Sequence, residues 1–222
     1  MTTITISNEL KHTCPNLHIG CITYHHIVIE SIPQMIERRM AVFFNELKLA
    51  LENKNVSDID GVSQFRKIFK AVGTDPSRYR PSQEALFRRV KKSGELYSVN
   101  SAVDINNFFS LHYEIPIGIY DLKQIHGDIQ LRIGDDHDTY EGLNGRVMSM
   151  KNKITSGDER GAFGSPIVDS KRTMVTEKTT DALALVYLKP AMQEDEAHQL
   201  LQAMRDMFIQ VHGGDASYKW IK

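Results

Sequence analysis

The spacing of apolar side chains predicts helices mainly in the first half of the chain. In residues 33–53, Ile36, Met40, Phe44 and Leu47 recur at three- and four-residue intervals, which places them on one face of a helix. The same spacing predicts helices at residues 59–71, 82–93 and 101–112, and a last helix after Pro190.

Strands are predicted mainly in the second half, by alternation of apolar and polar residues and by β-branched side chains. Asn144-Gly145 is a strong signal for the turn of a hairpin. The predicted strands are residues 2–7, 18–30, 116–121, 128–133, 140–150, 167–168 and 183–188. Because helices and strands are segregated along the chain, the predicted class is α+β, with a mixed sheet flanked by helices.

The composition is that of an ordinary soluble protein. The chain has 222 residues, of which 41% are hydrophobic and 25% charged. No apolar run approaches the ~18 residues that a membrane span needs, and the N-terminus MTTITISNEL does not resemble a signal peptide. No linker or repeat interrupts the sequence, so one domain over residues 1–222, located in the cytoplasm and without a membrane partner, is expected.

Two cysteines, Cys14 and Cys21, lie within HTCPNLHIGCITYHH, which also carries four histidines. Their spacing does not fit the common paired ligands of structural zinc, and ordinary packing is the favoured interpretation. A disulfide is not expected in a reducing compartment. The sequence indicates no cofactor, and whether these residues bind metal stays open.

Basic residues concentrate in residues 66–92, although the net charge of the chain is only −1. This segment has nine basic and two acidic residues. It is either a solvated helix face or a surface that engages phosphates. The side chains that would contact RNA phosphates are Arg78, Arg80, Arg88, Arg89, Lys91 and Lys92.

General catalytic motifs are absent from the sequence. GDERGAFGSPIVD lacks the Gly-Lys-Ser/Thr ending of a phosphate-binding P-loop, and it leads into a strand rather than a helix. The sequence contains no Gly-x-Ser-x-Gly elbow and no HExxH pair. The two cysteines have no basic helix terminus beside them, so a thiol nucleophile is not favoured.

The stretch NSAVDINNFFSLHYEIPIGIYDL, residues 100–122, sets Asn100, Asp104, Asn106 and Asn107 among apolar residues. Burying such groups without partners costs a few kcal/mol. On a helix, Asn100, Asp104 and Asn107 share one stripe. They therefore either pair within the fold or face a ligand.

This stretch resembles the segment N-x-x-V-D-I/V-T-N-Y … G-Q-P-L-H-A-F-D of the B3/B4 domain in the bacterial phenylalanyl-tRNA synthetase β subunit. Further motifs follow in the same order: residues 127–133, 143–145, 161–164 (G-I/V-M-G in the family) and 175–180 (V-T-x-x-T-T). The resemblance covers about residues 97–190. The chain as a whole is similar to free-standing B3/B4 proteins.

The resemblance implies an editing hydrolase that cleaves the ester of a tRNA carrying the wrong amino acid. It implies that Asn106 and Asn107 position the ester and a water, and that a loop over Gly161–Gly164 supplies backbone N–H groups to an oxyanion. Its implied partner is the aminoacylated 3′ end of a tRNA. The substrate-binding residues would be Asp104, Gly118, Asp121, Phe163 and Leu185.

Three positions depart from the family pattern. Asn106 replaces a threonine, Gly118 replaces a pocket histidine and is expected to leave room, and Leu185 replaces the glutamate that binds the tyrosine hydroxyl. Because a hydroxyl is discriminated by a buried polar partner, an amino acid other than tyrosine is expected. A guanidinium-bearing residue such as canavanine on the arginine tRNA is one candidate, with Asp104, Asp121 or Asp181 as its carboxylate.

Two alternatives stay open. The chain could be a tRNA-binding module without catalysis, because the histidine and glutamate are replaced. It could also be a small-molecule-binding domain with no RNA partner, because its net charge is close to zero.

Overall fold

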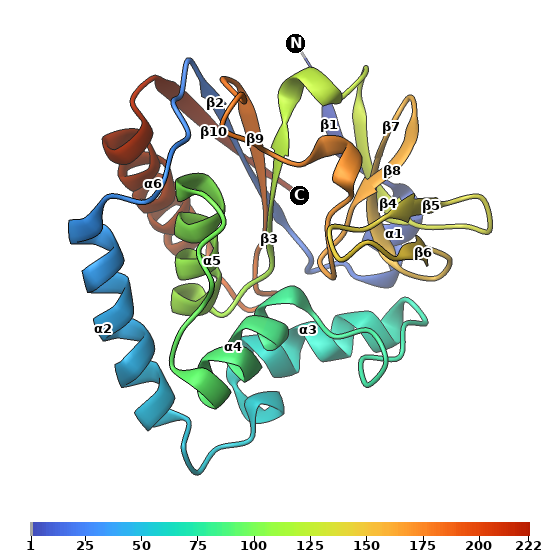
Figure 1. Ribbon diagram of the computed structural model, residues 1–222. Coiled ribbons are helices and arrows are strands. Elements are labelled where there is room, and N and C mark those ends of the chain that lie inside the picture. The colour runs from blue at the N-terminus through green and yellow to red at the C-terminus, as the bar shows by residue number, and fades with distance from the viewer. Residues whose placement is uncertain (1) are drawn as a thin grey trace.

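The computed structural model describes residues 2–222 (Figure 1). These residues form six α-helices and ten strands. Eight of the strands make two four-stranded sheets and the other two make a hairpin, which confirms the α+β class. The helices are α1 (Asn8–Thr13), α2 (Gln34–Ala50), α3 (Asp60–Ala71), α4 (Ser82–Ser93), α5 (Ser101–Tyr113) and α6 (Glu194–His212). Short 3-10 turns are η1 (Val56–Asp58), η2 (Leu122–Gln124) and η3 (Lys171–Thr173).

The central sheet is antiparallel and has the order β10-β2-β9-β3. All six residues of its strand β9 are buried, which explains the continuous apolar run ALALVY at this position. Its strands are β2 (Ile19–His25), β3 (Ile117–Asp121), β9 (Ala182–Tyr187) and β10 (Asp215–Ile221).

The second sheet has the order β1-β4-β7-β8, with β1 parallel to β4 and the other pairs antiparallel. A separate hairpin, β5 paired with β6, turns at Gly145, whose φ of 75° suits glycine. The strands are β1 (Ile4–Ile6), β4 (Ile129–Ile133), β5 (Thr139–Glu141), β6 (Val147–Ser149), β7 (Ile154–Asp158) and β8 (Gly161–Gly164).

The central sheet is covered differently on its two faces. On one face α6 packs so closely that a Cβ on Gly20 of β2 would collide with Leu201. On the other face, Tyr120 of β3 contacts Gly164 of β8, so the second sheet packs there. A smaller core joins α2 to α4 and α5 through Met40, Phe44, Phe87, Val90 and Leu111.

Several predicted elements differ from the observed ones. Residues 26–30 leave β2, because His26 has φ of 57°, and residues 167–168 form no strand. The predicted loop at Gly161–Gly164 is wrong, since this segment is β8. Helix α1 and strands β7 and β10 were not predicted. The helices α2 to α6 and strands β3, β4 and β9 are confirmed within a few residues.

Candidate functional site

Asp104, in the first turn of α5, holds the preceding segment in place. Its carboxylate accepts hydrogen bonds from the Ser98 hydroxyl at 2.5 Å and from the backbone N–H of Val99 at 2.9 Å. Asn100 caps the same helix, since its side-chain oxygen accepts from the N–H of Val103 at 3.0 Å. These two polar residues of the 100–107 stretch therefore have partners within the fold.

An acidic cleft of about 160 Å³ opens between α2, residues 95–98 and α5. Asp104 and Asn107 lie in its wall together with Glu37 and Glu95. No lysine or arginine among the described residues lines it, so the lining holds three acidic residues and no cation. Such a cleft attracts a positively charged group. Its other lining residues are Ile32, Met40, Ala41, Phe44, Leu96, Tyr97 and Ser98.

Of the three aspartates that the sequence offers for a guanidinium, Asp104 lies in this cleft. The Asp121 carboxylate is buried and accepts from the Lys123 N–H at 2.9 Å and the Thr179 hydroxyl at 2.8 Å. Asp181 pairs with His25 at 2.9 Å. Asp121 thus has the role of a structural brace in this fold.

Asn106 lies inside the protein with both of its amide atoms unpartnered. The residue is only 4% exposed, and neither its oxygen nor its nitrogen has a hydrogen-bond partner within residues 2–222. A buried polar group left in this way costs about 1–3 kcal/mol. Its neighbour Asn107 is half-buried in the acidic cleft. Adjacent amides of α5 therefore lie on two faces, one inside the protein and one in the cleft.

Tyr120 fills the room that Gly118 was expected to leave. A Cβ on Gly118 or on Gly164 would collide with the Tyr120 hydroxyl, so the Tyr120 side chain packs against both glycines. The hydroxyl donates to the carboxylate of Asp169 at 2.6 Å. Leu185 is fully buried beside Gly118 in the β3–β9 ladder. The expectation of an open space at Gly118 is therefore wrong.

Asp169 is the acidic residue of the cluster that Gly118, Tyr120, Gly164 and Asp169 form. Burial raises its pKa to about 7, although the hydrogen bond from Tyr120 acts in the opposite direction. Burial also raises the pKa of the Tyr120 hydroxyl, so it stays protonated and donates. Asp169 was not predicted as a site residue, because nothing near it along the chain indicates that its carboxyl packs against Tyr120.

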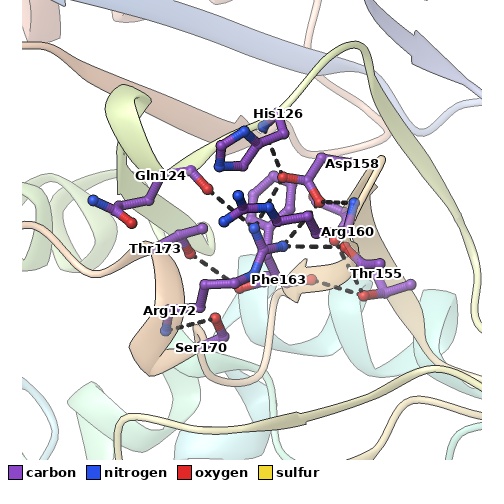
Figure 2. A network of polar contacts seen from close by, with 12 residues as sticks. Gln124, His126, Thr155, Asp158, Arg160, Phe163, Ser170, Arg172 and Thr173 are labelled. Atoms are coloured by element: carbon purple, nitrogen blue, oxygen red, sulfur yellow. Dashed lines mark hydrogen bonds and ion pairs between the residues drawn. The ribbon is translucent and has the colours of Figure 1, made fainter.

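Phe163 is buried in β8, where side chains of η3 fix the strand (Figure 2). Its carbonyl accepts from the N–H of Ser170 at 2.9 Å, and the carbonyl of Gly161 accepts from Arg172 at 3.3 Å. Arg172 also forms a two-pronged ion pair with Asp158 at 2.9 and 3.0 Å. Gly161 has φ of 106°, as expected for a glycine that a turn requires.

The basic segment divides into two groups. Glu84 of α4, whose side chain is fully buried, binds Arg66 at 2.9 Å, Arg88 at 2.9 Å and Arg80 at 3.9 Å. Arg66, Arg80 and Arg88 therefore neutralise an internal carboxylate, which sequence reasoning counted only as one acidic residue. The second group, exposed and without a carboxylate within 4.0 Å in residues 2–222, comprises Lys67, Lys70, Arg78, Arg89 and Lys92.

A shallow pocket of about 420 Å³ lies beside α4 and is lined by Arg88, Lys91 and Lys92 together with Asn55 and Ser57. Lys91 also donates to the carbonyl of Lys54 at 2.7 Å. Lys91, Lys92 and the two small polar side chains suit an oxyanion such as a phosphate, whereas the charge of Arg88 is already paired with Glu84. This pocket contains half of the predicted RNA-contacting residues.

Cys14 and Cys21 are free and buried. Burial raises the pKa of the Cys21 thiol to about 12, so it stays protonated and is a poor nucleophile. Across residues 2–222, no group of three or more His, Cys, Asp or Glu side chains gathers as metal ligands would. Nor is any helix in that range long and apolar enough to cross a membrane.

The contact between Gly164 and Tyr120 gives a direct test of the cluster. Gly164→Ala should destabilise the protein by about 1–3 kcal/mol, because the new methyl group overlaps the Tyr120 ring. In a Tyr120→Leu background the same substitution should cost clearly less. Urea unfolding of the four proteins measures this coupling, and strictly additive costs would contradict the contact.

Comparisons with known proteins agree with the motifs found in the sequence. The chain is 25% identical over 218 residues to the "Uncharacterized protein YhzB" of Bacillus subtilis (strain 168), a match that covers 98% of this chain and 99% of that protein. It is 33% identical over 105 residues to the phenylalanine–tRNA ligase beta subunit of Nitrobacter winogradskyi, covering 46% of this chain and 13% of that subunit. The chain thus spans nearly all of the first relative and a small part of the ligase subunit.

Among solved structures, an N-terminal fragment of the phenylalanyl-tRNA synthetase β-subunit from Pyrococcus horikoshii covers 97% of this chain. The match takes in 50% of that chain at 13% identity, with a TM-score of 0.47. The sequence model of the B3/4 domain matches residues 64–207, well over half of the chain. The chain therefore belongs to the B3/4 domain family.

Proposed function

We propose that this protein binds the aminoacylated 3′ end of a tRNA and hydrolyses the ester of a misplaced amino acid. The family includes a domain of subunits named phenylalanine–tRNA ligase, which act on tRNA. The observation that carries the proposal is the buried side-chain amide of Asn106, whose oxygen and nitrogen both lack a partner in residues 2–222. Its neighbour Asn107 lies in the acidic cleft. A ligand or a bound water would satisfy these groups.

In the proposed reaction, water attacks the ester carbonyl, and the ribose oxygen of the terminal nucleotide leaves with a proton. Asn106 and Asn107 orient the ester and the water, and their amide N–H groups stabilise the developing oxyanion. The N–H groups of Gly161–Gly164 are not assigned this role, because that segment is strand β8, paired with β7, and Gly164 lies against Tyr120. An activated ester needs mainly positioning and charge stabilisation, so a Ser-His-Asp triad is not required.

The acidic cleft supports a cationic amino acid as the one removed. The exposed Glu37 and Glu95 would face its guanidinium or ammonium group, which makes canavanine on the arginine tRNA a better candidate than tyrosine. Asp104 adds negative charge to the wall behind them, although its two carboxylate oxygens already accept from Ser98 and Val99. Exposed Arg78, Arg89 and Lys92, together with the pocket beside α4, would hold tRNA phosphates. This contribution should fall steeply with salt.

The test is loss of ester from a panel of charged tRNAs that includes canavanine on arginine tRNA, tyrosine on phenylalanine tRNA and correctly charged controls. The wild-type protein should deacylate one misacylated species selectively. The double variant Asn106→Ala/Asn107→Ala should lose roughly 10²-fold or more in rate, because it removes both positioning groups. Asn53→Ala, an exposed asparagine outside the site, is the matched control.

Filter binding of tRNA at low and high salt separates the alternatives. Deacylation at the wild-type rate by the double variant would remove Asn106 and Asn107 from the site. Salt-sensitive binding without turnover of any species would instead identify a non-catalytic tRNA-binding module. Absence of tRNA binding even at low salt would favour a small-molecule-binding domain.

A further inference from the structure

The outer face of α2 carries an apolar stripe that nothing in residues 2–222 covers. Met35, Val42 and Leu49 are 65%, 59% and 72% exposed, and they follow one another at intervals of seven residues. The inner face of the same helix packs Met40 and Phe44 into the α2–α4 core. Figure 1 shows α2 as the outermost helix on one side of the molecule.

This stripe is unusual for a surface helix. An amphipathic helix needs one apolar face, and the inner face already supplies it. Three of the nine large exposed hydrophobic residues in the described chain lie on this one line. Apolar residues repeated every seven positions on a helix are typical of a seam against another helix.

The charges beside the stripe indicate which helix fits. Arg39 and Glu46 lie on the same flank of the stripe, seven residues apart, and both are exposed. Neither has an oppositely charged partner within 4.0 Å in residues 2–222. In an antiparallel pair of identical helices, each flank faces the same flank of the partner, with residue order reversed.

We propose that α2 pairs with α2 of a second copy of this chain, antiparallel and about a two-fold axis at Val42. Val42 then contacts its own copy, and Met35 packs on Leu49 of the other chain. Arg39 of each chain lies opposite Glu46 of the other, which forms two ion pairs. A parallel pairing would instead bring Arg39 toward Arg38 of the partner and is disfavoured by like charge.

The expected dimer is concentration-dependent. A helix of 17 residues is about 26 Å long, so one helix from each chain gives an interface near the lower limit for stable complexes. We therefore expect a dissociation constant on the order of micromolar. The inference does not depend on the proposed function, although Glu37 and Ala41 on another flank of α2 line the acidic cleft.

Sedimentation velocity over a concentration series of the full chain tests the pairing. The wild-type protein should shift from monomer to dimer, and Val42→Glu should stay monomeric because it places two carboxylates on the axis. Glu46→Arg alone and Arg39→Glu alone should each weaken the dimer. An equimolar mixture of these two variants should dimerise, because all four cross-chain charges then match. Failure of the mixture to associate would overturn the antiparallel arrangement.

A cysteine cross-link provides a second measurement that does not depend on affinity. Val42→Cys should form an intermolecular disulfide under mild oxidation, whereas Val147→Cys should not. Val147, on β6 at the opposite side of the molecule in Figure 1, is 78% exposed and is therefore an equally accessible control. The native cysteines are buried and add little background. Equal cross-linking of both variants, or none at Val42→Cys, would overturn the proposal.

Discussion

Replacing Arg172 with alanine is expected to destabilise the fold by about 3–5 kcal/mol, because the substitution leaves a buried carboxylate without its cation. The carboxylate is that of Asp158, whose side chain has no exposed surface. Burial by itself would raise the pKa of Asp158, but hydrogen bonds from Arg172 and from the N–H groups of His126 and Arg160 hold it below its ordinary value. Arg172 also binds the carbonyls of Gln124 and Gly161, so three segments lose a common partner (Figure 2).

Urea unfolding of Arg172→Ala measures this loss. The neighbouring Lys171→Ala is the matched control, since Lys171 pairs with Glu141 on the surface at 2.5 Å, with both side chains about half exposed. An exposed pair contributes at most about 1 kcal/mol. Adding Asp158→Asn to Arg172→Ala should recover part of the stability, because the unpaired charge is then removed. Equal costs for Arg172→Ala and Lys171→Ala would show that the network does not stabilise β8.

Helices α2 to α6 were predictable because their signals are local. Helix α4 has its apolar face in the spacing of Phe87 and Val90 and its end at Gly94, whose φ of 82° is the left-handed conformation that glycine favours. Strand β9 was visible as an unbroken apolar run. In both cases a single segment determines the interpretation, whatever the rest of the chain does.

Strand β10 was not predictable in the same way. It pairs along its full length with β2, about two hundred residues earlier in the chain, and one side of it faces solvent. Its residues DASYKWI therefore carry only a weak alternation. The six residues of α1 are too few to establish a helical period. Non-local pairing and short length, rather than unusual residues, hid these two elements.

In the candidate site, too, residues with a local sequence signal were predictable, and residues placed by non-local packing were not. Asp104, Asn106 and Asn107 were found because they interrupt an apolar helix and belong to a motif. Tyr120 was unremarkable in the sequence as one aromatic residue in a strand. Only the packing of two sheets brings its hydroxyl between Gly118, Gly164 and Asp169. Glu37 and Glu95 read as ordinary surface charges until α2 and residues 95–98 form the cleft.

Asp169 leads to the second large effect, a pH-dependent stability that one substitution should abolish. Its carboxyl titrates at about 7 in the folded protein against an ordinary value of 3.8. Between these values the folded protein holds a proton that the unfolded chain has released. The free energy of unfolding therefore falls as pH rises through this window. The shift corresponds to a ceiling of roughly 4 kcal/mol, reached above neutral pH.

Asp169→Asn should remove this pH dependence while keeping an oxygen that accepts from Tyr120. The variant should match the wild type at about pH 4, where the aspartate is mostly protonated in the folded state, and should be more stable than the wild type at about pH 8. Urea unfolding at both pH values measures the difference in free energy of unfolding between the variant and the wild type. The contributions of titrating groups common to the two proteins cancel in this difference. Asp215→Asn, whose side chain is 86% exposed, is the control and should show no such crossover. A wild type that is the more stable protein at the higher pH would mean that Asp169 is ionised and well solvated, and that the Tyr120 cluster is open to water.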